Sequence, residues 1–433
     1  MIFASSLRLH LQVLCTARRP VQRLLDVWPT LPLAIWDHNL HERRRPHVDV
    51  DNILAALEHH DRVRHIELWG ISNAQLGRIA AVTQEPFPEL TFLELLSDGR
   101  GAAAALPDSF FGGAAPRPRL HTVHLKGIPF PPVRELLLSA THLVDLDLWN
   151  MSYSGFVSTE ETVNCLAVMT RLKSLFLGFH SPLSCPDPAN QDPPPPIRTV
   201  LPALTHFKYR GVSETLEDLV ARIDVPLLDN AEITFFNQLL FDSSRLPQFM
   251  TFIGRINKFK VFDQACVLFQ ARYGQVRLSS QPGTVDHAAL KLKIASKASD
   301  WQLSSLSQVC DRSLLPYTVQ RLDIREDPDL ESHWEDDMEN GQWKELLDPF
   351  TDVKDLYLSK ELALRIARAL QELVWATEVL PVLQNIFLEG LEPSRVVQEA
   401  IGPFIAARQL SNYPVAVHYL KEGKWVLHAP GGR

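Results

Sequence analysis

The stretch Leu120-His-Thr-Val-His-Leu-Lys-Gly-Ile128 places apolar residues at its first, fourth and sixth positions. The same spacing returns in Leu143-Val-Asp-Leu-Asp-Leu148 and in Leu172-Lys-Ser-Leu-Phe-Leu177. Side chains in a strand alternate between two faces, so the last two apolar residues of each motif point to one side and the residues between and after them to the other. Each motif therefore predicts a strand with one buried face and one exposed face.

The motif recurs along the chain at separations typical of a structural repeat. Successive starts are 27, 30, 23, 29 and 32 residues apart in the first block, and 34 and 30 residues apart in the last. Leucine-rich repeats have periods of roughly 20–29 residues. We therefore predict an α/β fold, a divergent leucine-rich-repeat-like solenoid of horseshoe form, with mostly parallel strands on its concave face and helices on its convex face. The nine motifs are 63–68, 90–95, 120–125, 143–148, 172–177, 204–209, 319–324, 353–358 and 383–388.

The segments between the motifs have helical patterns. Ser158-x-x-Glu161 is a capping box that precedes an apolar face at Val163 and Leu166. Ser213 is expected to cap another helix. A short strand and a short helix cannot bury their apolar faces alone, so neighbouring repeats are expected to stack into one core. Further helices are predicted at 51–60, 133–142, 246–256, 360–376 and 395–408.

The predicted domain organisation is simple. Residues 1–48 are expected to form an N-terminal capping segment, and residues 49–433 the solenoid. A proline-rich loop is expected at 182–197, and the repeats are irregular over 210–318, although 228–233 and 290–294 keep strand patterns. Glycine follows four motifs, at Gly70, Gly127, Gly211 and Gly390, where we expect a left-handed turn that returns the next aliphatic residue to the core.

Composition narrows the function classes. The 433 residues carry a formal charge of -8, which has the wrong sign for binding to a phosphate backbone, so no nucleic-acid partner is expected. The five cysteines are scattered and odd in number, which favours reduced thiols in an intracellular protein of the cytoplasm or nucleus. Residues 6–17 alternate polar with apolar and predict a strand, not a signal peptide. No apolar run is long enough for a membrane span, so no membrane partner is expected.

Motifs with possible chemistry each have a simpler explanation. Gly99-Arg-Gly101 begins a nucleotide-binding pattern, but Pro107 interrupts the helix that this pattern needs. Asp145 and Asp147 have the spacing of a metal-binding pair, yet they alternate with leucines of a repeat strand. His121 and His124 are three residues apart and are expected on opposite faces of a strand. The acidic segment 331–339 lacks calcium-loop spacing and is expected to be a solvated loop. We predict no catalytic residues, no metal and no cofactor.

The residues that alternate with the buried positions are rich in aromatic and charged types, which dominate the energetic centres of protein interfaces. An unidentified protein ligand is therefore the expected partner, bound by these side chains on the concave face. They are Glu67, Trp69, Glu94, His124, Lys126, Asp147, Trp149, Phe176, Lys208, Arg210, Asp323, Arg325, Tyr357, Phe387 and Glu389.

Segments across the whole chain resemble one protein family. They are 9–33, 51–58, 63–68, 301–306, 322–326, 342–350 and 383–390. These segments are similar to basidiomycete fungal F-box proteins with degenerate leucine-rich repeats. The resemblance implies the substrate-recognition part of an SCF-type (cullin-based) ubiquitin ligase receptor.

One departure from the family leaves alternatives open. In the family the F-box, which docks on the ligase adaptor, precedes the opening strand, and this sequence begins after it. The sequence therefore predicts a non-catalytic protein-binding scaffold. The alternatives are a genuine F-box receptor with a truncated gene model, which would also bind adaptor and cullin, and a divergent metal-dependent α/β enzyme that uses Asp145 and Asp147.

Overall fold

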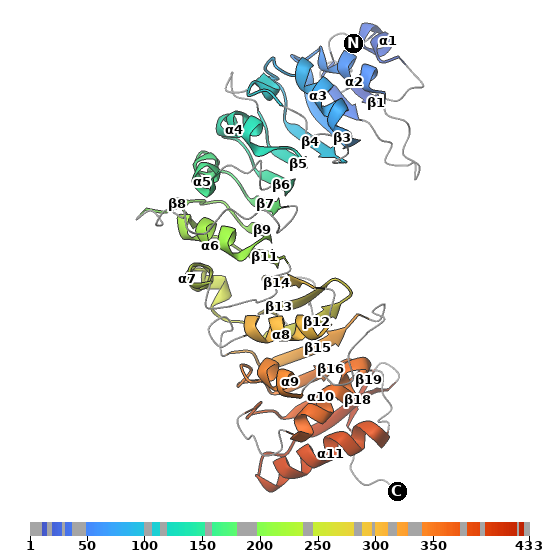
Figure 1. Cartoon of the computed structure of the whole chain (residues 1–433), viewed down its shortest axis with the longest axis vertical. Helices are drawn as coiled ribbons and strands as arrows, with labels where there is room; N and C mark the ends of the chain where they lie inside the picture. The colour runs from blue at the N-terminus through green and yellow to red at the C-terminus, as the bar shows by residue number, and fades with distance from the viewer. Residues whose placement is uncertain are drawn as a thin grey trace, which may run out of the picture. The chain divides into compact units, whose positions relative to one another are not determined.

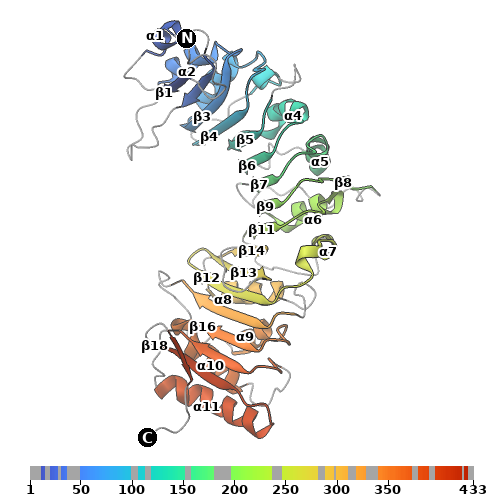
Figure 2. The same cartoon turned by 180° about the vertical axis from the view of Figure 1, so that it is seen from behind.

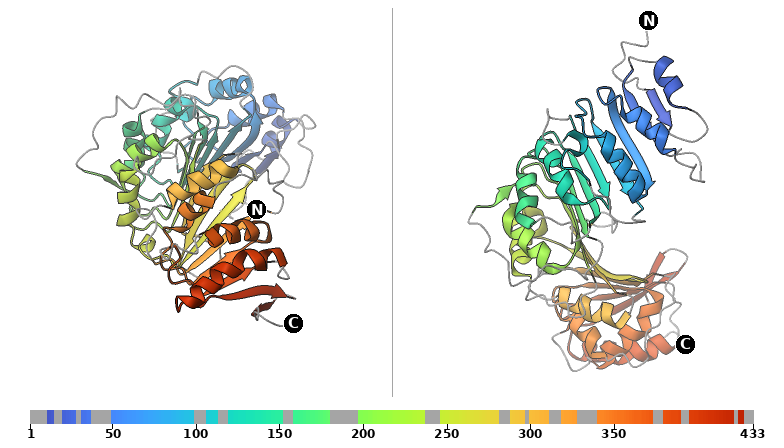
Figure 3. Two further views of the ribbon diagram at one scale, coloured as in Figure 1. Left: turned by 60° about the horizontal axis from the view of Figure 1, so that its bottom comes forward. Right: turned by 45° about the horizontal axis from the view of Figure 1, so that its top comes forward.

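The computed structural model of the chain divides into two compact units. Unit 1 comprises 1–211 and 218–228, and unit 2 comprises 212–217 and 229–433. In each unit strands and helices alternate, and the helices lie along one side of the sheet (Figures 1 and 2). Two further views show the same layering within each unit (Figure 3). The structure describes residues 11–14, 20–27, 31–36, 49–98, 106–112, 119–151, 158–179, 197–236, 246–280, 288–296, 299–310, 318–327, 340–372, 379–389, 395–421 and 424–427.

Unit 1 is a parallel sheet whose strands follow one another in chain order. Each strand pairs with the next in parallel. Its strands are β1 (Leu11–Leu14), β2 (Leu33–Trp36), β3 (Val63–Ile71), β4 (Phe92–Ser97), β5 (Thr122–Lys126), β6 (Asp145–Met151), β7 (Ser174–Phe179) and β9 (His206–Gly211). Its helices are α1 (Gln22–Val27), α2 (Val50–Leu57), α3 (Asn73–Val82), η2 (Phe110–Gly112), α4 (Phe130–Ser139) and α5 (Thr159–Ala167). A separate parallel pair joins β8 (Thr199–Val200) to β10 (Ile223–Asp224), and α6 (Ser213–Arg222) contains the division between the units.

Unit 2 begins with an irregular sheet and returns to the repeat. Its strands are β11 (Asn230–Phe235), β12 (Gln264–Gln270), β13 (Tyr273–Ser279), β14 (Leu290–Ala295), β15 (Arg321–Glu326), β16 (Asp355–Leu358), β17 (Asn385–Leu388), β18 (Ala416–Lys421) and β19 (Lys424–Leu427). Strand β13 lies antiparallel between β12 and β14, and β12 and β14 pair in parallel with β15 and β11. This inserted strand explains why the sequence repeat loses its phase over 210–318. The helices are α7 (Pro247–Arg255), η7 (Asn257–Phe259), α8 (Ser299–Val309), α9 (Asn340–Leu347), α10 (Lys360–Glu372) and α11 (Arg395–Leu410).

The repeat motifs form the core that their spacing predicts. In register, Leu95, Leu125, Leu148, Leu177 and Tyr209 make one continuous row across β4 to β9. All of these side chains are at most 3% exposed. Burying a leucine side chain fully contributes roughly 1.5–3 kcal/mol. The predicted α/β repeat fold is therefore confirmed, with mostly parallel strands and helices on one side of each sheet.

The turn predicted after the strands is confirmed at two positions and wrong at a third. Gly70 and Gly127 have φ values of 69° and 67°, which glycine adopts without strain. Asn150 takes the same left-handed conformation, with φ 59°, and was not predicted. At Gly211 φ is not positive; an added Cβ would instead clash with the rings of Tyr209 and Phe179. Gly390 lies outside the described residues. The aliphatic residues that follow are buried: Ile71, Ile128, Met151 and Val212.

The predicted helices are also confirmed. Helix α5 begins after Ser158, whose hydroxyl accepts a hydrogen bond from the Glu161 N–H at 3.3 Å. The structure has α2, α4, α7, α10 and α11 where helices were predicted. The motif at 99–101, the proline-rich residues 182–196 and the acidic segment 331–339 lie outside the described residues. Among the helices described, none is long and apolar enough to cross a membrane.

Candidate binding surface

The helix-free side of the sheet in unit 1 presents three rows of polar and aromatic side chains, which we call the unit 1 face. Because strands β3 to β9 pair in register, equivalent side chains align from strand to strand. The first row is His65, Phe92, Thr122, Asp145, Ser174 and His206; the second is Glu67, Glu94, His124, Asp147, Phe176 and Lys208; the third includes Leu96, Lys126, Trp149 and Arg210.

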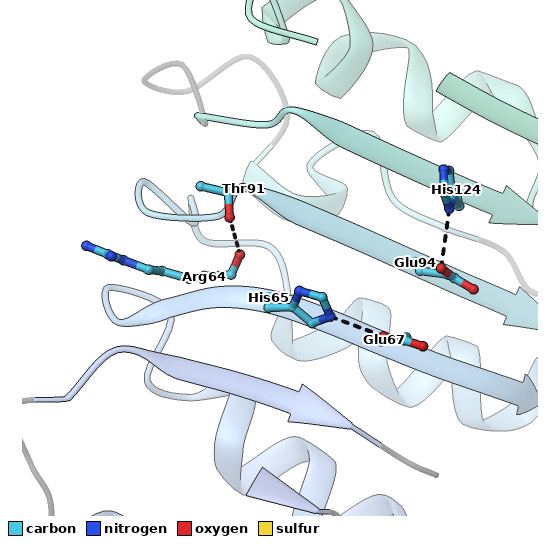
Figure 4. Close-up of polar contacts among 6 residues, drawn as sticks. All are labelled: Arg64, His65, Glu67, Thr91, Glu94 and His124. Atoms are coloured by element: carbon cyan, nitrogen blue, oxygen red, sulfur yellow. Dashed lines mark hydrogen bonds and ion pairs between the residues drawn. The ribbon is translucent and has the colours of Figure 1, made fainter. Parts of the chain in front are cut away.

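His124 lies at the centre of the unit 1 face and joins three strands. Its Nδ1 is 3.3 Å from a carboxylate oxygen of Glu94 on β4, and its Nε2 is 3.4 Å from Oδ2 of Asp145 on β6. Hydrogen bonds to Asp145 and then Glu94 raise the pKa of His124 to about 10. The same contact with His124 lowers the pKa of Asp145. His124 is therefore a charged link between its two neighbouring strands at neutral pH. Figure 4 shows its contact with Glu94.

Asp147 is the least satisfied carboxylate of this face. Burial raises its pKa to about 6, although the nearby charges of His124 and Lys208 act in the opposite direction. Its Oδ1 atom is buried and accepts no hydrogen bond from any described residue. An unpaired buried oxygen costs free energy that a donor from a binding partner would recover.

Two aromatic side chains next to Asp147 carry lysines over their rings. The Lys126 ammonium lies 4.6 Å from the Trp149 ring centroid, and the Lys208 ammonium lies 5.8 Å from that of Phe176. The two rings are 6.3 Å apart. Trp149 is 37% exposed, which is unusual for the largest apolar side chain. These residues form an apolar platform with a cationic rim.

A second aromatic group lies toward β2. The His65 ring stacks between Trp36 and Phe92, with centroid distances of 4.7 and 4.2 Å. Its Nε2 contacts a carboxylate oxygen of Glu67 at 3.2 Å, along the same strand (Figure 4). Glu67 is only 8% exposed, so on this face it orients His65 and offers little surface of its own.

The helix-free side of unit 2 has its own polar and aromatic groups. Arg325 donates two hydrogen bonds to Asp323, at 2.8 and 2.7 Å, which raise the pKa of the guanidinium further. Asp323 is 3% exposed and is covered in this pair. Beyond it, Tyr357 stacks on Phe387 at 4.2 Å. Trp425 meets both rings edge-on, at 5.7 and 5.2 Å.

The structure places most of the predicted contact residues on these two helix-free sides. Glu67 and Asp323 are there but buried. Trp69 pairs with Leu96 of the third row and also lines a pocket at the end of β3 with Val50 and Ile53 of α2. Glu389 is exposed directly after β17. The residues of these sides that were not predicted are His65, Phe92, Asp145, Arg321, His418 and Trp425. The first four lie two positions before predicted contact residues. Because side chains alternate along a strand, the same pattern would have identified them.

The structure places the two pairs that the sequence analysis did not assign to metal sites in different ways. His121 precedes β5 and is exposed, whereas His124 lies within the strand and is held by two acids. Asp145 contacts His124 while Asp147 is buried beside it. Among the described residues no group of three or more histidines, cysteines or acids is arranged to hold a metal ion. The described cysteines Cys165, Cys266 and Cys310 are free and buried.

Comparisons with known proteins find similarity in structure and none in sequence. No family model matches the chain. No curated protein matches it either. Among solved structures, the leucine-rich repeat-containing protein LegL7 from Legionella pneumophila is similar at 14% sequence identity and a TM-score of 0.31, and the match covers 75% of this chain and 93% of that chain.

Proposed function

We propose that this chain is a non-catalytic scaffold that binds a protein partner on the unit 1 face. The observation that carries the proposal is the group formed by Trp149, Phe176 and Asp147. It combines two partly accessible aromatic rings, two lysines over them and one buried carboxylate oxygen without a hydrogen bond. Large aromatic side chains beside charged groups are the residues that contribute most to binding between proteins.

The shape of the surface favours a protein over a small molecule. Small-molecule sites are concave and enclose the ligand, whereas the three rows lie on one open side of a parallel sheet. The charges are also divided along it. Acids lie on β3, β4 and β6, with His124 and Lys126 between them on β5, while the exposed Lys208 and Arg210 lie on β9. A partner that fits would place an acidic segment over β9 and donors over Asp147.

The finer proposal is that this scaffold is the substrate-recognition part of an SCF-type ubiquitin ligase receptor. It is supported by the resemblance of segments such as 51–58, 322–326 and 383–390 to basidiomycete F-box proteins. On this proposal the partner captured by the unit 1 face is a substrate, and the protein acts in the cytoplasm or nucleus.

Affinity capture with the full chain tests both the scaffold proposal and the ligase proposal. Trp149→Ala with Phe176→Ala removes the aromatic platform. Val200→Ala with Leu227→Ala is the matched control, because these apolar side chains of unit 1 are 51% and 59% exposed and lie outside the three rows. We expect a partner, identified by mass spectrometry, that the wild type and the control bind directly when it is purified and that the platform variant loses. Equal binding by all three proteins would contradict the proposal.

The ligase proposal has a separate readout in the same experiment. For this readout the three proteins are expressed from the native gene with a C-terminal tag, because the family's F-box, which docks on the adaptor, precedes the opening strand. Peptides of a ligase adaptor and a cullin should then be captured by all three proteins, because the platform is not expected to touch them. Their absence from every sample would remove the ligase proposal and leave the scaffold proposal standing.

A further inference from the structure

A pocket in unit 1 lies at the carboxyl end of β3, between helices α2 and α3 (Figure 1). It has a volume of about 210 Å³ and is partly open to solvent. In parallel α/β sheets, small ligands bind outside the carboxyl ends of the strands. The pocket is lined by Val50 and Ile53 of α2, by Trp69, Gly70 and Ile71 of β3, and by Gln75 and Ile79 of α3.

A bulge in β3 shapes this pocket. Gly70 is an extra residue between two pairs that β3 makes with β4, Trp69 with Leu96 and Ile71 with Ser97. Its φ of 69° is left-handed, and a bulge of this kind bends the strand and redirects side chains. Three consecutive residues of β3 therefore line the pocket, although side chains in a regular strand alternate between two faces. Bulges are frequent next to active sites for this reason.

The wall of the pocket is apolar and uncharged. The three isoleucines, Ile53, Ile71 and Ile79, are at most 3% exposed, so the wall is continuous with the core. None of the lining residues that the structure describes is ionisable. Asp51 and Arg78, which neighbour lining residues along α2 and α3, pair with each other at 2.5 Å. Because an unpaired charge is costly to remove from water, the pocket favours a neutral ligand.

Gln75 offers the pocket a hydrogen-bond donor whose orientation is fixed. Its Oε1 accepts hydrogen bonds from the Ser72 N–H at 2.9 Å and from the Ser72 hydroxyl at 3.0 Å. The Gln75 N–H donates in return to the Ser72 Oγ at 3.3 Å, which completes the capping box of α3. The amide Nε2 donates to no residue in the part of the chain that the structure describes. Because Oε1 is already engaged, the amide suits a ligand that brings an acceptor.

We propose that this pocket binds a small, neutral aromatic molecule that carries a carbonyl oxygen. An apolar cavity of about 150 Å³ is large enough to bind benzene, so a pocket of about 210 Å³ accommodates one ring with a short substituent. The ring packs against Trp69 and the isoleucines, and the carbonyl accepts a hydrogen bond from Gln75 Nε2. An apolar wall with few polar groups is typical of small-molecule sites. Of the lining residues, only Trp69 aligns with a row of the unit 1 face.

Fluorine NMR line broadening with the full chain tests the proposal, with para-fluoroacetophenone as the probe. We expect the wild type to broaden the signal of the probe. Val50→Phe should weaken its affinity at least about tenfold, because the added ring takes up space in the pocket. Val27→Phe is the matched control, since Val27 of α1 is 66% exposed and lies outside the lining. It should bind the probe as the wild type does.

Gln75→Glu tests the hydrogen bond separately from the apolar wall. Glutamate keeps an oxygen that accepts from Ser72 in the capping box, but it replaces the Nε2 donor by a second oxygen. The affinity for para-fluoroacetophenone should therefore fall about tenfold, whereas the affinity for fluorobenzene, which has no carbonyl, should change less than about twofold. Equal affinity of the wild type for the two probes would refute the hydrogen bond.

Absence of broadening with the wild type, or equal broadening with Val50→Phe, overturns the proposal. A competing probe is N-acetylphenylalaninamide, which presents an aromatic side chain as a protein partner would. If it displaces para-fluoroacetophenone and binds more tightly, the pocket receives a side chain of a protein and the small-molecule proposal is refuted. Circular dichroism of each variant shows whether it is folded. The platform variant of the unit 1 face should bind para-fluoroacetophenone normally, so failure here and failure of the proposed function can be told apart.

Discussion

Replacing His124 by glutamine should make the stability of unit 1 less dependent on pH. In the wild type, His124 contacts Glu94 and Asp145, and these contacts raise its pKa from an ordinary 6.5 to about 10. A histidine whose pKa is raised by folding contributes stability that is fully present below its unfolded pKa. That contribution is lost as the pH rises from about 6.5 to about 10.

The magnitude follows from the exposure of the three side chains. His124, Glu94 and Asp145 are 27%, 14% and 40% exposed, so solvent screens both contacts in part. Partly exposed ion pairs contribute about 0.2–1 kcal/mol each, and hydrogen bonds to charged groups somewhat more. We therefore expect His124→Gln to lower the free energy of unfolding by about 1–2 kcal/mol at pH 6, and by far less at pH 10.

Two measurements check this expectation. Chemical unfolding of the wild type and His124→Gln between pH 6 and 10 gives the difference in free energy, and hydrogen exchange of peptides from β4 to β6 assigns it to unit 1. His121→Gln is the matched control, because His121 is exposed three residues earlier. Proton NMR of the histidine rings follows the titration of His124 directly. A difference that stays constant with pH, or a His124 ring that titrates near pH 6.5, would refute the reasoning.

Four further substitutions should alter the free energy of unfolding in predictable directions. Asp147→Asn should raise the free energy of unfolding by about 1 kcal/mol at pH 8 and leave it unchanged below pH 4. The reason is that the pKa of Asp147 is raised to about 6, so its ionisation destabilises the folded state. Thermal unfolding at both pH values checks this, and destabilisation at pH 8 would contradict it. Leu146→Ala should lower the free energy of unfolding by about 2–5 kcal/mol, because Leu146 lies in the core and is 1% exposed. Urea unfolding measures the difference. Gly127→Ala should destabilise the protein by about 1–2 kcal/mol, because Gly127 has a φ of 67°. Gly77→Ala in α3, where an added Cβ meets nothing within 4 Å, should stabilise it by up to about 1 kcal/mol. Thermal unfolding compares the two variants, and equal effects would show that backbone strain is absent at Gly127.

The sequence predicted the strands well because burial alternates along them. A position such as Leu146 is apolar for a local reason, since its side chain points to the helices wherever the strand pairs. The unpredicted strands β12 and β13 form a hairpin within the irregular region, where one strand runs against its neighbours. The repeat spacing does not indicate a strand that runs antiparallel to its neighbours, so the β12–β13 hairpin could not be predicted from the sequence.

The contact residues were predicted by the same alternation, but their chemistry was not. The spacing of the apolar residues placed His124 and Asp147 on one exposed side of the sheet. It did not indicate that His124 would be charged or that the pKa of Asp147 would be raised. The charge of His124 depends on Glu94 and Asp145 of the two neighbouring strands, and the raised pKa of Asp147 depends mainly on its burial. The burial of Asp323 has the same origin, because Arg325 and the adjacent strands cover it.

The α/β repeat, the buried positions and the exposed rows follow from the sequence alone, because hydrophobic periodicity along one strand decides which side faces the core. Which exposed residues meet depends on how the strands pair in the folded chain. Register between strands joins Glu94, His124 and Asp145 in unit 1, and stacks Tyr357 on Phe387 in unit 2. Electrostatic interactions act through space over a few ångströms, so they are fixed by strand pairing and not by order along the chain.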